Sequence, residues 1–172
     1  EPLTLLHGDI VVIDDDPEIR DQLAALFAEA GMAVRCFAAA EDFLAAYSPV
    51  QCACAVVDMA LAGMDGMQLL AALAEREILL PVIFLTGYGD VPSSVRALKA
   101  GAFDYLCKPV SGSVLLASVR AALEAGERLS RNFERMHDAS TLLGALTRRE
   151  REVLRLAVDG MANKVIARRL GI

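Results

Sequence analysis

The chain has 172 residues, of which 55% are hydrophobic, and a formal net charge of −6 at pH 7. This length allows one well-buried domain of ordinary size and a smaller second unit. The sequence contains no apolar run long enough to span a membrane, and its amino end lacks the basic and then apolar pattern of a secretory signal. Composition therefore argues against a membrane partner, and we expect a soluble, cytoplasmic protein.

Charge is divided unevenly along the chain. Residues 1–125 carry 7 positive and 17 negative side chains, whereas residues 126–172 carry 10 positive and 6 negative ones. An acidic first part suits a metal site, and a basic excess in the second part suits a polyanionic partner. We place a linker where the sign of the charge changes.

The first apolar run, residues 10–13, ends in three acidic residues, Asp14, Asp15 and Asp16. A buried strand here delivers carboxylates to its own end. Adjacent carboxylates repel one another and resist losing water, so a folded site that contains several normally holds a divalent cation. Asp16 and Pro17 are typical of an N-cap and a first helical position, which assigns Asp16 to capping. A solvated turn is the alternative for all three acidic residues.

Three later apolar runs also end in polar residues: 53–57 with Asp58, 82–85 with Thr86, and 103–107 with Lys108 and Pro109. Segments with helical spacing of apolar residues lie between the runs. This alternation predicts an α/β fold with a five-stranded, doubly wound parallel sheet and helices on both faces. Because ligands bind beyond the carboxyl ends of such strands, we expect these polar side chains to converge with the acidic pair.

The four cysteines, Cys36, Cys52, Cys54 and Cys107, lie in or beside apolar runs. A reduced thiol there behaves as a small hydrophobe, so we expect buried thiols. Cys52 and Cys54 share one strand face, but no other Cys or His pair completes a metal-ligand set.

The last third of the chain reads as helical. An apolar helical pattern at residues 114–123 continues into a charged stretch at residues 124–135, which predicts a last sheet-packing helix that runs out into a second, mostly solvated one. Thr147 and Glu150 then form the sequence pattern of a capping box, so a new helical module begins there.

Taken together, these residues resemble the receiver domain of two-component response regulators. The resemblance rests on five places in order along the chain: Asp14-Asp15, Asp58, Met64-Asp65-Gly66, Thr86-Gly87 and Lys108-Pro109. Residues 86–102 resemble the FixJ-type subgroup, and residues 146–154 and 163–167 resemble the opening of a LuxR-type helix-turn-helix domain. The resemblance implies a flavodoxin-like receiver over residues 9–123, a helical linker over 124–142, and an all-α helix-turn-helix fragment over 143–172.

The resemblance also implies a chemistry for the acidic residues. Asp58 would accept a phosphoryl group from a phosphohistidine of a sensor histidine kinase. Asp15, Asp58 and the backbone carbonyl of Ala60 would hold Mg²⁺, with Mn²⁺ as an alternative, and Asp14 would act mainly through water.

Two further site residues and a switch follow from the same resemblance. Lys108 and the Thr86 hydroxyl would contact the phosphoryl oxygens. Thr86 would then move toward the phosphate and the Tyr105 ring would turn inward, altering the surface of the fourth helix, fifth strand and fifth helix and promoting homodimerisation. The spacing of Tyr105 fits a half-buried core position equally well, so both interpretations stay open.

The chain departs from the family pattern in two places. Ala62 stands where many receivers have proline, so the loop after Asp58 is expected to be looser. The sequence stops at Ile172, where a LuxR-type domain would turn into its recognition helix, so DNA-contact residues are unassigned and we expect DNA as a partner only for the full-length protein. Arg148, Arg149 and Arg151 fit a solvated helix face better than base contacts.

Three classes of function are compatible with parts of this pattern. A transcription regulator controlled by phosphorylation is favoured. A magnesium-dependent phosphatase with an aspartyl intermediate would need a general acid two residues after Asp58, where Ala60 stands. We therefore expect a phosphoacceptor signalling protein that catalyses its own phosphoryl transfer, and not an enzyme in the ordinary sense. A phosphotransfer or interaction module that does not bind DNA is the alternative.

Overall fold

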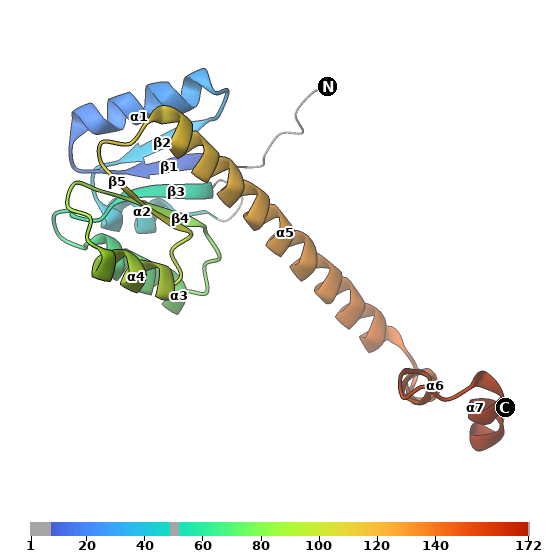
Figure 1. The fold of residues 1–172 in the computed structure, drawn as a ribbon. Coiled ribbons are helices and arrows are strands. Elements are labelled where there is room, and N and C mark those ends of the chain that lie inside the picture. Colours follow the sequence, from blue (N-terminus) through green and yellow to red (C-terminus); the bar gives the residue numbers. More distant parts are fainter. Residues whose placement is uncertain (1–7, 49–51, 172) are drawn as a thin grey trace. The chain divides into compact units, whose positions relative to one another are not determined.

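The computed structural model describes residues 8–48 and 52–171 of the chain. The chain divides into two compact units, Glu1–Arg128 and Leu129–Ile172. Unit 1 contains a five-stranded parallel sheet in the order β2-β1-β3-β4-β5 (Figure 1). The strands are β1 (Asp9–Ile13), β2 (Val34–Phe37), β3 (Cys52–Asp58), β4 (Val82–Thr86) and β5 (Asp104–Cys107). The predicted doubly wound α/β fold is confirmed.

Helices cover both faces of this sheet (Figure 1). One face packs against α1 (Pro17–Glu29) and the first turns of α5 (Gly112–Ala145). The other face packs against α2 (Ala40–Ala46), α3 (Gly66–Glu75) and α4 (Val91–Lys99). Because both faces are buried, the central strands are almost continuously apolar, and side chains of β1 alternate between the two cores.

Two elements of unit 1, β2 and α2, have no clear pattern in the sequence. β2 is a four-residue edge strand in which no residue is fully buried, so it lacks the apolar run that marked the other strands. α2 has seven residues and begins after Ala39, which makes no side-chain capping bond. Neither element therefore carried a strong local signal.

Helix starts follow the predicted chemistry. Asp16 is the N-cap of α1 and accepts a hydrogen bond from the Glu18 backbone N–H at 2.9 Å, with Pro17 in the first turn. Thr147 and Glu150 form a capping box at the start of α6 (Arg148–Val158). Both predictions are confirmed, because capping depends on residues adjacent in sequence.

The last sheet-packing helix and the solvated helix that was expected to continue it form a single element. α5 runs without interruption from Gly112 to Ala145 and includes the charged stretch after residue 123. Its charged residues are good helix formers and the stretch contains no proline, so a single internal Gly126 does not end the helix. Within the described ranges, we find no helix whose length and apolarity would let it cross a membrane.

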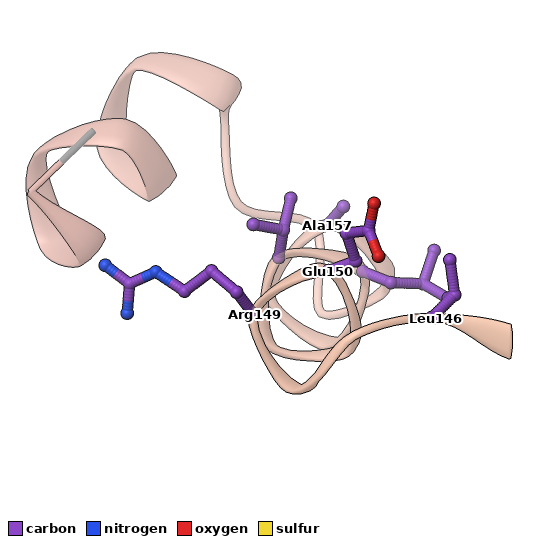
Figure 2. Close-up of a pocket in the computed structure, with 6 residues that line it drawn as sticks. Leu146, Arg149, Glu150 and Ala157 are labelled. Carbon is purple, nitrogen blue, oxygen red and sulfur yellow. The ribbon is translucent and has the colours of Figure 1, made fainter. Parts of the chain in front are cut away.

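The second unit consists of the end of α5, α6 and α7 (Asn163–Leu170). Arg149 donates to the Leu170 carbonyl at the end of α7 and forms an ion pair with Glu152 at 3.3 Å, so this arginine links the two helices. Residue 172, the last of the predicted helix-turn-helix fragment, lies outside the described ranges. α6 borders an apolar groove of about 420 Å³ (Figure 2), lined by Leu146, Arg149, Glu150, Val153, Leu154 and Ala157.

The four thiols differ in exposure, so the prediction that all are buried is wrong for two of them. Cys52 and Cys54 are buried in β3, whereas Cys36 and Cys107 are exposed. Cys36 lies in the edge strand β2 and Cys107 ends β5, so neither is covered on both sides. Burial raises the pKa of the Cys54 thiol to about 12, which leaves it protonated at neutral pH.

Candidate functional site

The candidate site lies where the strand order reverses. β1 has β2 on one side and β3 on the other. From β1 the chain adds β2 in one direction across the sheet, and it then adds β3, β4 and β5 in the other direction. In such sheets the ligand crevice lies beyond the carboxyl ends of the two strands at the reversal. Asp14 and Asp15 directly follow β1, and Asp58 is the last residue of β3.

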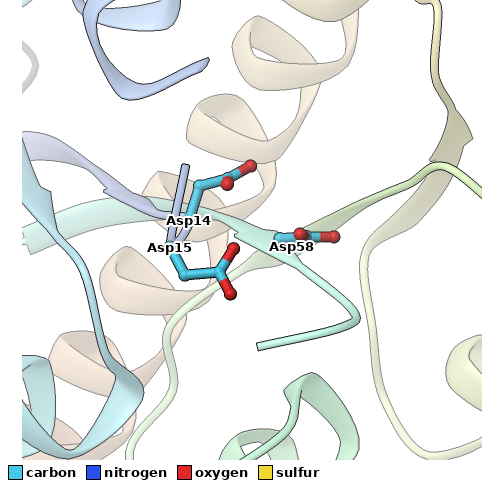
Figure 3. Close-up of side chains that lie close together, drawn as sticks. All are labelled: Asp14, Asp15 and Asp58. Carbon is cyan, nitrogen blue, oxygen red and sulfur yellow. The ribbon is translucent and has the colours of Figure 1, made fainter. Parts of the chain in front are cut away.

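The three carboxylates meet at this edge. Each of Asp14, Asp15 and Asp58 offers an oxygen, and the three oxygens lie within 4.8 Å of one another. Figure 3 shows their side chains at the neighbouring ends of β1 and β3. Mg²⁺ and Mn²⁺ prefer carboxylate, carbonyl and water oxygens, so this donor set fits such a cation.

Asp14 is the most enclosed of the three, with 2% of its surface exposed. One of its carboxylate oxygens accepts a hydrogen bond from Lys108 Nζ at 3.0 Å, and the other accepts from the Asp16 backbone N–H at 2.9 Å. Its backbone carbonyl accepts from Arg20 Nη1 at 2.7 Å. Asp14 is therefore fixed from three directions, and both carboxylate oxygens already have a donor.

Asp58 is held more loosely. Lys108 Nζ lies 3.6 Å from its Oδ2, and the Ala60 backbone N–H donates to its Oδ1 at 3.4 Å. Burial raises the pKa of the Asp58 carboxyl; Lys108 and the Ala60 N–H oppose this rise, and the charges of Asp14 and Asp15 add to it. The net pKa is raised, so the ionised carboxylate would be stabilised by a further cation nearby.

Lys108 is the cation between these carboxylates. It follows β5, and its peptide bond to Pro109 is cis. Burial by itself would lower its pKa, but the hydrogen bond and charge of Asp14 and the charge of Asp58 outweigh burial, so the pKa is raised. Lys108 is therefore a positive charge throughout the neutral range.

Thr86 and Tyr105 lie on the neighbouring strands. Thr86 ends β4, is 4% exposed, and its Oγ1 accepts from the Tyr88 backbone N–H at 3.2 Å. Its carbonyl accepts from the Lys108 backbone N–H at 2.7 Å, which joins the ends of β4 and β5. Tyr105 pairs in register with Phe84 and packs, partly buried, against the core on the α2–α4 face. Its core position is thus real, while the switch stays a prediction.

Two contacts at this edge had no sequence signal. Arg20 of α1 holds the Asp14 carbonyl, and Glu41 of α2 accepts a hydrogen bond from the Met64 backbone N–H at 2.8 Å. Met64 lies in the loop after Asp58, 23 residues from Glu41. Contacts over such separations are set by packing of the helices, and local spacing does not reveal them.

Comparison with known protein families gives two matches. Residues 10–120 match the response regulator receiver domain, and residues 144–172 match the bacterial regulatory proteins of the luxR family. The first match covers most of unit 1, including the acidic cluster. The second covers α6 and α7.

Individual relatives agree along nearly the whole chain. The transcriptional regulatory protein FixJ of Azorhizobium caulinodans is 40% identical over 94% of this chain and 76% of the relative. The C4-dicarboxylate transport transcriptional regulatory protein DctR of Rhodobacter capsulatus is 40% identical over 94% of this chain and 83% of the relative.

Solved structures give the same result. The response regulator StyR is similar with a TM-score of 0.85 and 37% identity, over 96% of this chain and 84% of that one. Full-length FixJ from B. japonicum is similar with a TM-score of 0.67 and 36% identity, over 96% and 81% of the two chains. The chain therefore belongs to the response regulators and joins a receiver domain to a LuxR-type DNA-binding domain, as a homologue of the FixJ and DctR transcriptional regulators.

Proposed function

We propose that Asp58 accepts a phosphoryl group from a phosphohistidine of a sensor histidine kinase, and that phosphorylation promotes dimerisation and transcriptional regulation. The observation that supports this most directly is the position of Asp58. It shares one strand-end crevice with two further carboxylates, all within 4.8 Å, and with the ammonium of Lys108. An isolated surface aspartate would have no such neighbours.

The acidic cluster fits Mg²⁺, with Mn²⁺ as an alternative. Asp15, Asp58 and the Ala60 backbone carbonyl would hold the ion, and Asp14, whose oxygens are already engaged, would act mainly through water. When bound, the cation offsets the negative charge of the carboxylates and of the incoming phosphoryl oxygens.

The chain's own residues account for the transfer step. A carboxylate oxygen of Asp58 attacks phosphorus, the new O–P bond replaces the N–P bond, and the electron pair returns to the imidazole of the kinase. Lys108, already 3.6 Å from Asp58, donates to a phosphoryl oxygen, and the Thr86 hydroxyl donates to another. Asp58 is thus a nucleophile, and the receiver supplies the groups that promote its own phosphorylation.

Phosphorylation adds about 1.5 to 2 negative charges at one point of the crevice. We expect Thr86 to move toward the new oxygens and Tyr105 to turn inward. The surface near these residues already exposes apolar side chains of α4 and of the segment before β5. They are Val91, Val95, Leu98 and Phe103, with 75%, 41%, 46% and 37% of their surface exposed. Such a surface suits homodimerisation.

The LuxR-type match favours DNA as the final partner over a module that does not bind DNA. α5 begins on the receiver sheet and continues to Ala145, close to the start of that match. A regulator of this kind acts where the chromosome is, so we place the protein in the cytoplasm.

Incubation with acetyl phosphate and Mg²⁺, followed by intact mass measurement and sedimentation, tests the proposal. Wild-type protein should gain one phosphoryl group and sediment as a larger species, whereas Asp58→Asn should gain none. Asp42→Asn removes an exposed carboxylate of α2 and should behave as wild type. An equal mass gain in Asp58→Asn would end the acceptor assignment. A gain without a change in sedimentation would end only the dimer.

A further inference from the structure

We propose that Glu41 is a positioning residue for the phosphorylation site, a role that rests on the function proposed above. It does not touch the reacting atoms. It fixes the loop that carries the Ala60 carbonyl and so influences how well the site binds its cation and takes up phosphate.

The contact is short and specific. Glu41 Oε1 accepts a hydrogen bond from the Met64 backbone N–H at 2.8 Å. The same oxygen lies beside Gly63, where an added Cβ would come within 2.7 Å of it. Gly63 has φ +79°, a backbone conformation that residues with a side chain rarely adopt. A glycine at this position lets the loop backbone pass close to the Glu41 carboxylate.

The backbone hydrogen bonds of the rest of the loop lie mainly at its own base, while the Leu61 side chain, 7% exposed, is buried in the core. The Met59 N–H donates to the Leu85 carbonyl of β4 at 3.0 Å, and the Gly66 N–H donates to the Met59 carbonyl at 3.2 Å. The Asp65 N–H donates to Gln68 within the capping box of α3. Among the hydrogen bonds of the described residues, the Glu41 contact is the one that ties the outer part of this loop to α2.

Glu41 can fix the loop because α2 is itself fixed. Ala40, Phe43 and Leu44 of α2 are buried in the core that also contains α3. Arg76, just after α3, donates to the Leu44 carbonyl at 3.5 Å. Although Glu41 is exposed, its backbone therefore belongs to a well-packed element, and its side chain links that element to the loop.

The loop matters because Ala60 lies in it. The Ala60 N–H donates to Asp58 Oδ1, and the Ala60 carbonyl is a proposed cation ligand. With Ala62 in place of a proline, this segment has more conformational freedom in the unfolded chain. Folding the loop therefore costs more conformational entropy than it would with proline. A charge-assisted hydrogen bond from a rigid element offsets part of this cost. Glu41 thus keeps the Ala60 carbonyl in place before the cation binds.

Three variants test this role. Glu41→Ala removes the acceptor. Glu41→Gln keeps a side-chain carbonyl that can accept from Met64. Asp42→Ala is the matched control, because it removes the same charge from the same first turn of α2. Four measurements are compared among the variants. They are the hydrogen exchange of the Met64 amide in magnesium-free protein, the Mg²⁺ affinity from a titration followed by NMR amide shifts, the rate of phosphorylation by acetyl phosphate, and the urea midpoint.

We expect Glu41→Ala to speed exchange of the Met64 amide and to weaken Mg²⁺ binding by about three- to tenfold. Phosphorylation of this variant should be slower, while its urea midpoint should stay close to that of Asp42→Ala. Glu41→Gln should restore most of the Mg²⁺ affinity. If Glu41→Ala matches Asp42→Ala in exchange and in Mg²⁺ affinity, the role of Glu41 is overturned while the acceptor assignment stands. Faster exchange with unchanged Mg²⁺ affinity overturns it as well. If wild-type protein takes up no phosphate, the function proposed above fails, and this inference fails with it.

Discussion

The two units of the chain obtain their structure from different sources. Unit 1 buries side chains on both faces of a five-stranded sheet, and residues such as Phe27 and Phe84 are completely enclosed. Among the described residues of the second unit, Ile166 and Leu170 are the buried hydrophobic ones, while Val158 is 78% exposed. Tertiary packing therefore stabilises the first unit, whereas the second depends more on local helix signals such as the Thr147 capping box.

The units also differ in the role of charge. Unit 1 gathers carboxylates of separate strands around one lysine, and the cost of this arrangement is offset by Lys108 and, as we propose, by a cation. In the second unit, the ion pair of Arg149 with Glu152 links residues three apart on one exposed helix face. Under the function proposed above, the first arrangement would bind a cation, whereas the exposed ion pair of the second unit is screened by solvent and contributes little to stability.

Truncation of a core side chain of unit 1 should give the largest change in the free energy of unfolding. Phe27→Ala should lower the free energy of unfolding of unit 1 by about 3 to 5 kcal/mol, because Phe27 is fully buried between α1 and the sheet. Leu79→Ala, at a side chain that is 77% exposed, should change it by less than about 0.5 kcal/mol. Urea unfolding followed through amide exchange of the strands provides the comparison. Equal effects of the two variants would contradict the described core.

Magnesium should act on one unit only. At a Mg²⁺ concentration about 100 times the dissociation constant, the free energy of unfolding of unit 1 should rise by about 2.7 kcal/mol, because the ion binds the folded site. Thermal unfolding with Mg²⁺ or EDTA measures this. Asp15→Asn should reduce the rise, and Asp42→Asn should not. A rise that is unchanged in Asp15→Asn, or that also appears in α6, would place the ion elsewhere.

Loss of the cap should be felt mainly in the second unit. Thr147→Ala removes the hydroxyl that accepts from the Glu150 N–H and should destabilise α6 by about 1 kcal/mol. Thr147→Ser retains the hydroxyl and serves as the control. Amide exchange in the first turn of α6 should become faster in Thr147→Ala alone, with the strands of unit 1 unchanged. Slower or equal exchange would show that the cap contributes little to α6.

The smallest effect concerns the pH dependence of stability that comes from the Asp58 carboxyl, because Lys108 and the Ala60 N–H oppose the effect of burial on its pKa. Its pKa is raised in the folded protein above the ordinary value of 3.8, so the folded state binds more protons within that window. Stability attributable to this group is therefore present below pH 3.8 and is lost as pH rises through the folded pKa.

Asp58→Asn has no such titration. In EDTA, this variant should be more stable than wild type at neutral pH, and the difference should vanish as pH falls toward 3.8. The urea midpoint of unit 1 measured against pH provides the test. A difference that persists unchanged at acid pH would assign the effect to packing and not to ionisation.

Local and periodic features were readable in the sequence. The central strands, the helix starts at Asp16 and Thr147, and the convergence of Asp14, Asp15, Asp58 and Lys108 all follow from residues adjacent in the chain or from the geometry of parallel strands. An apolar run followed by a polar residue is sufficient to place that residue at the ligand-binding edge of such a sheet.

Only the tertiary structure decided the features that depend on packing between distant segments. It placed β2 and α2, whose short segments lack strong periodicity. It also decided that Lys108 lies closer to Asp14 than to Asp58, and that Glu41 reaches the loop of Met64. Each is set by how buried faces fit together over many residues, and no local pattern in the chain specifies that fit.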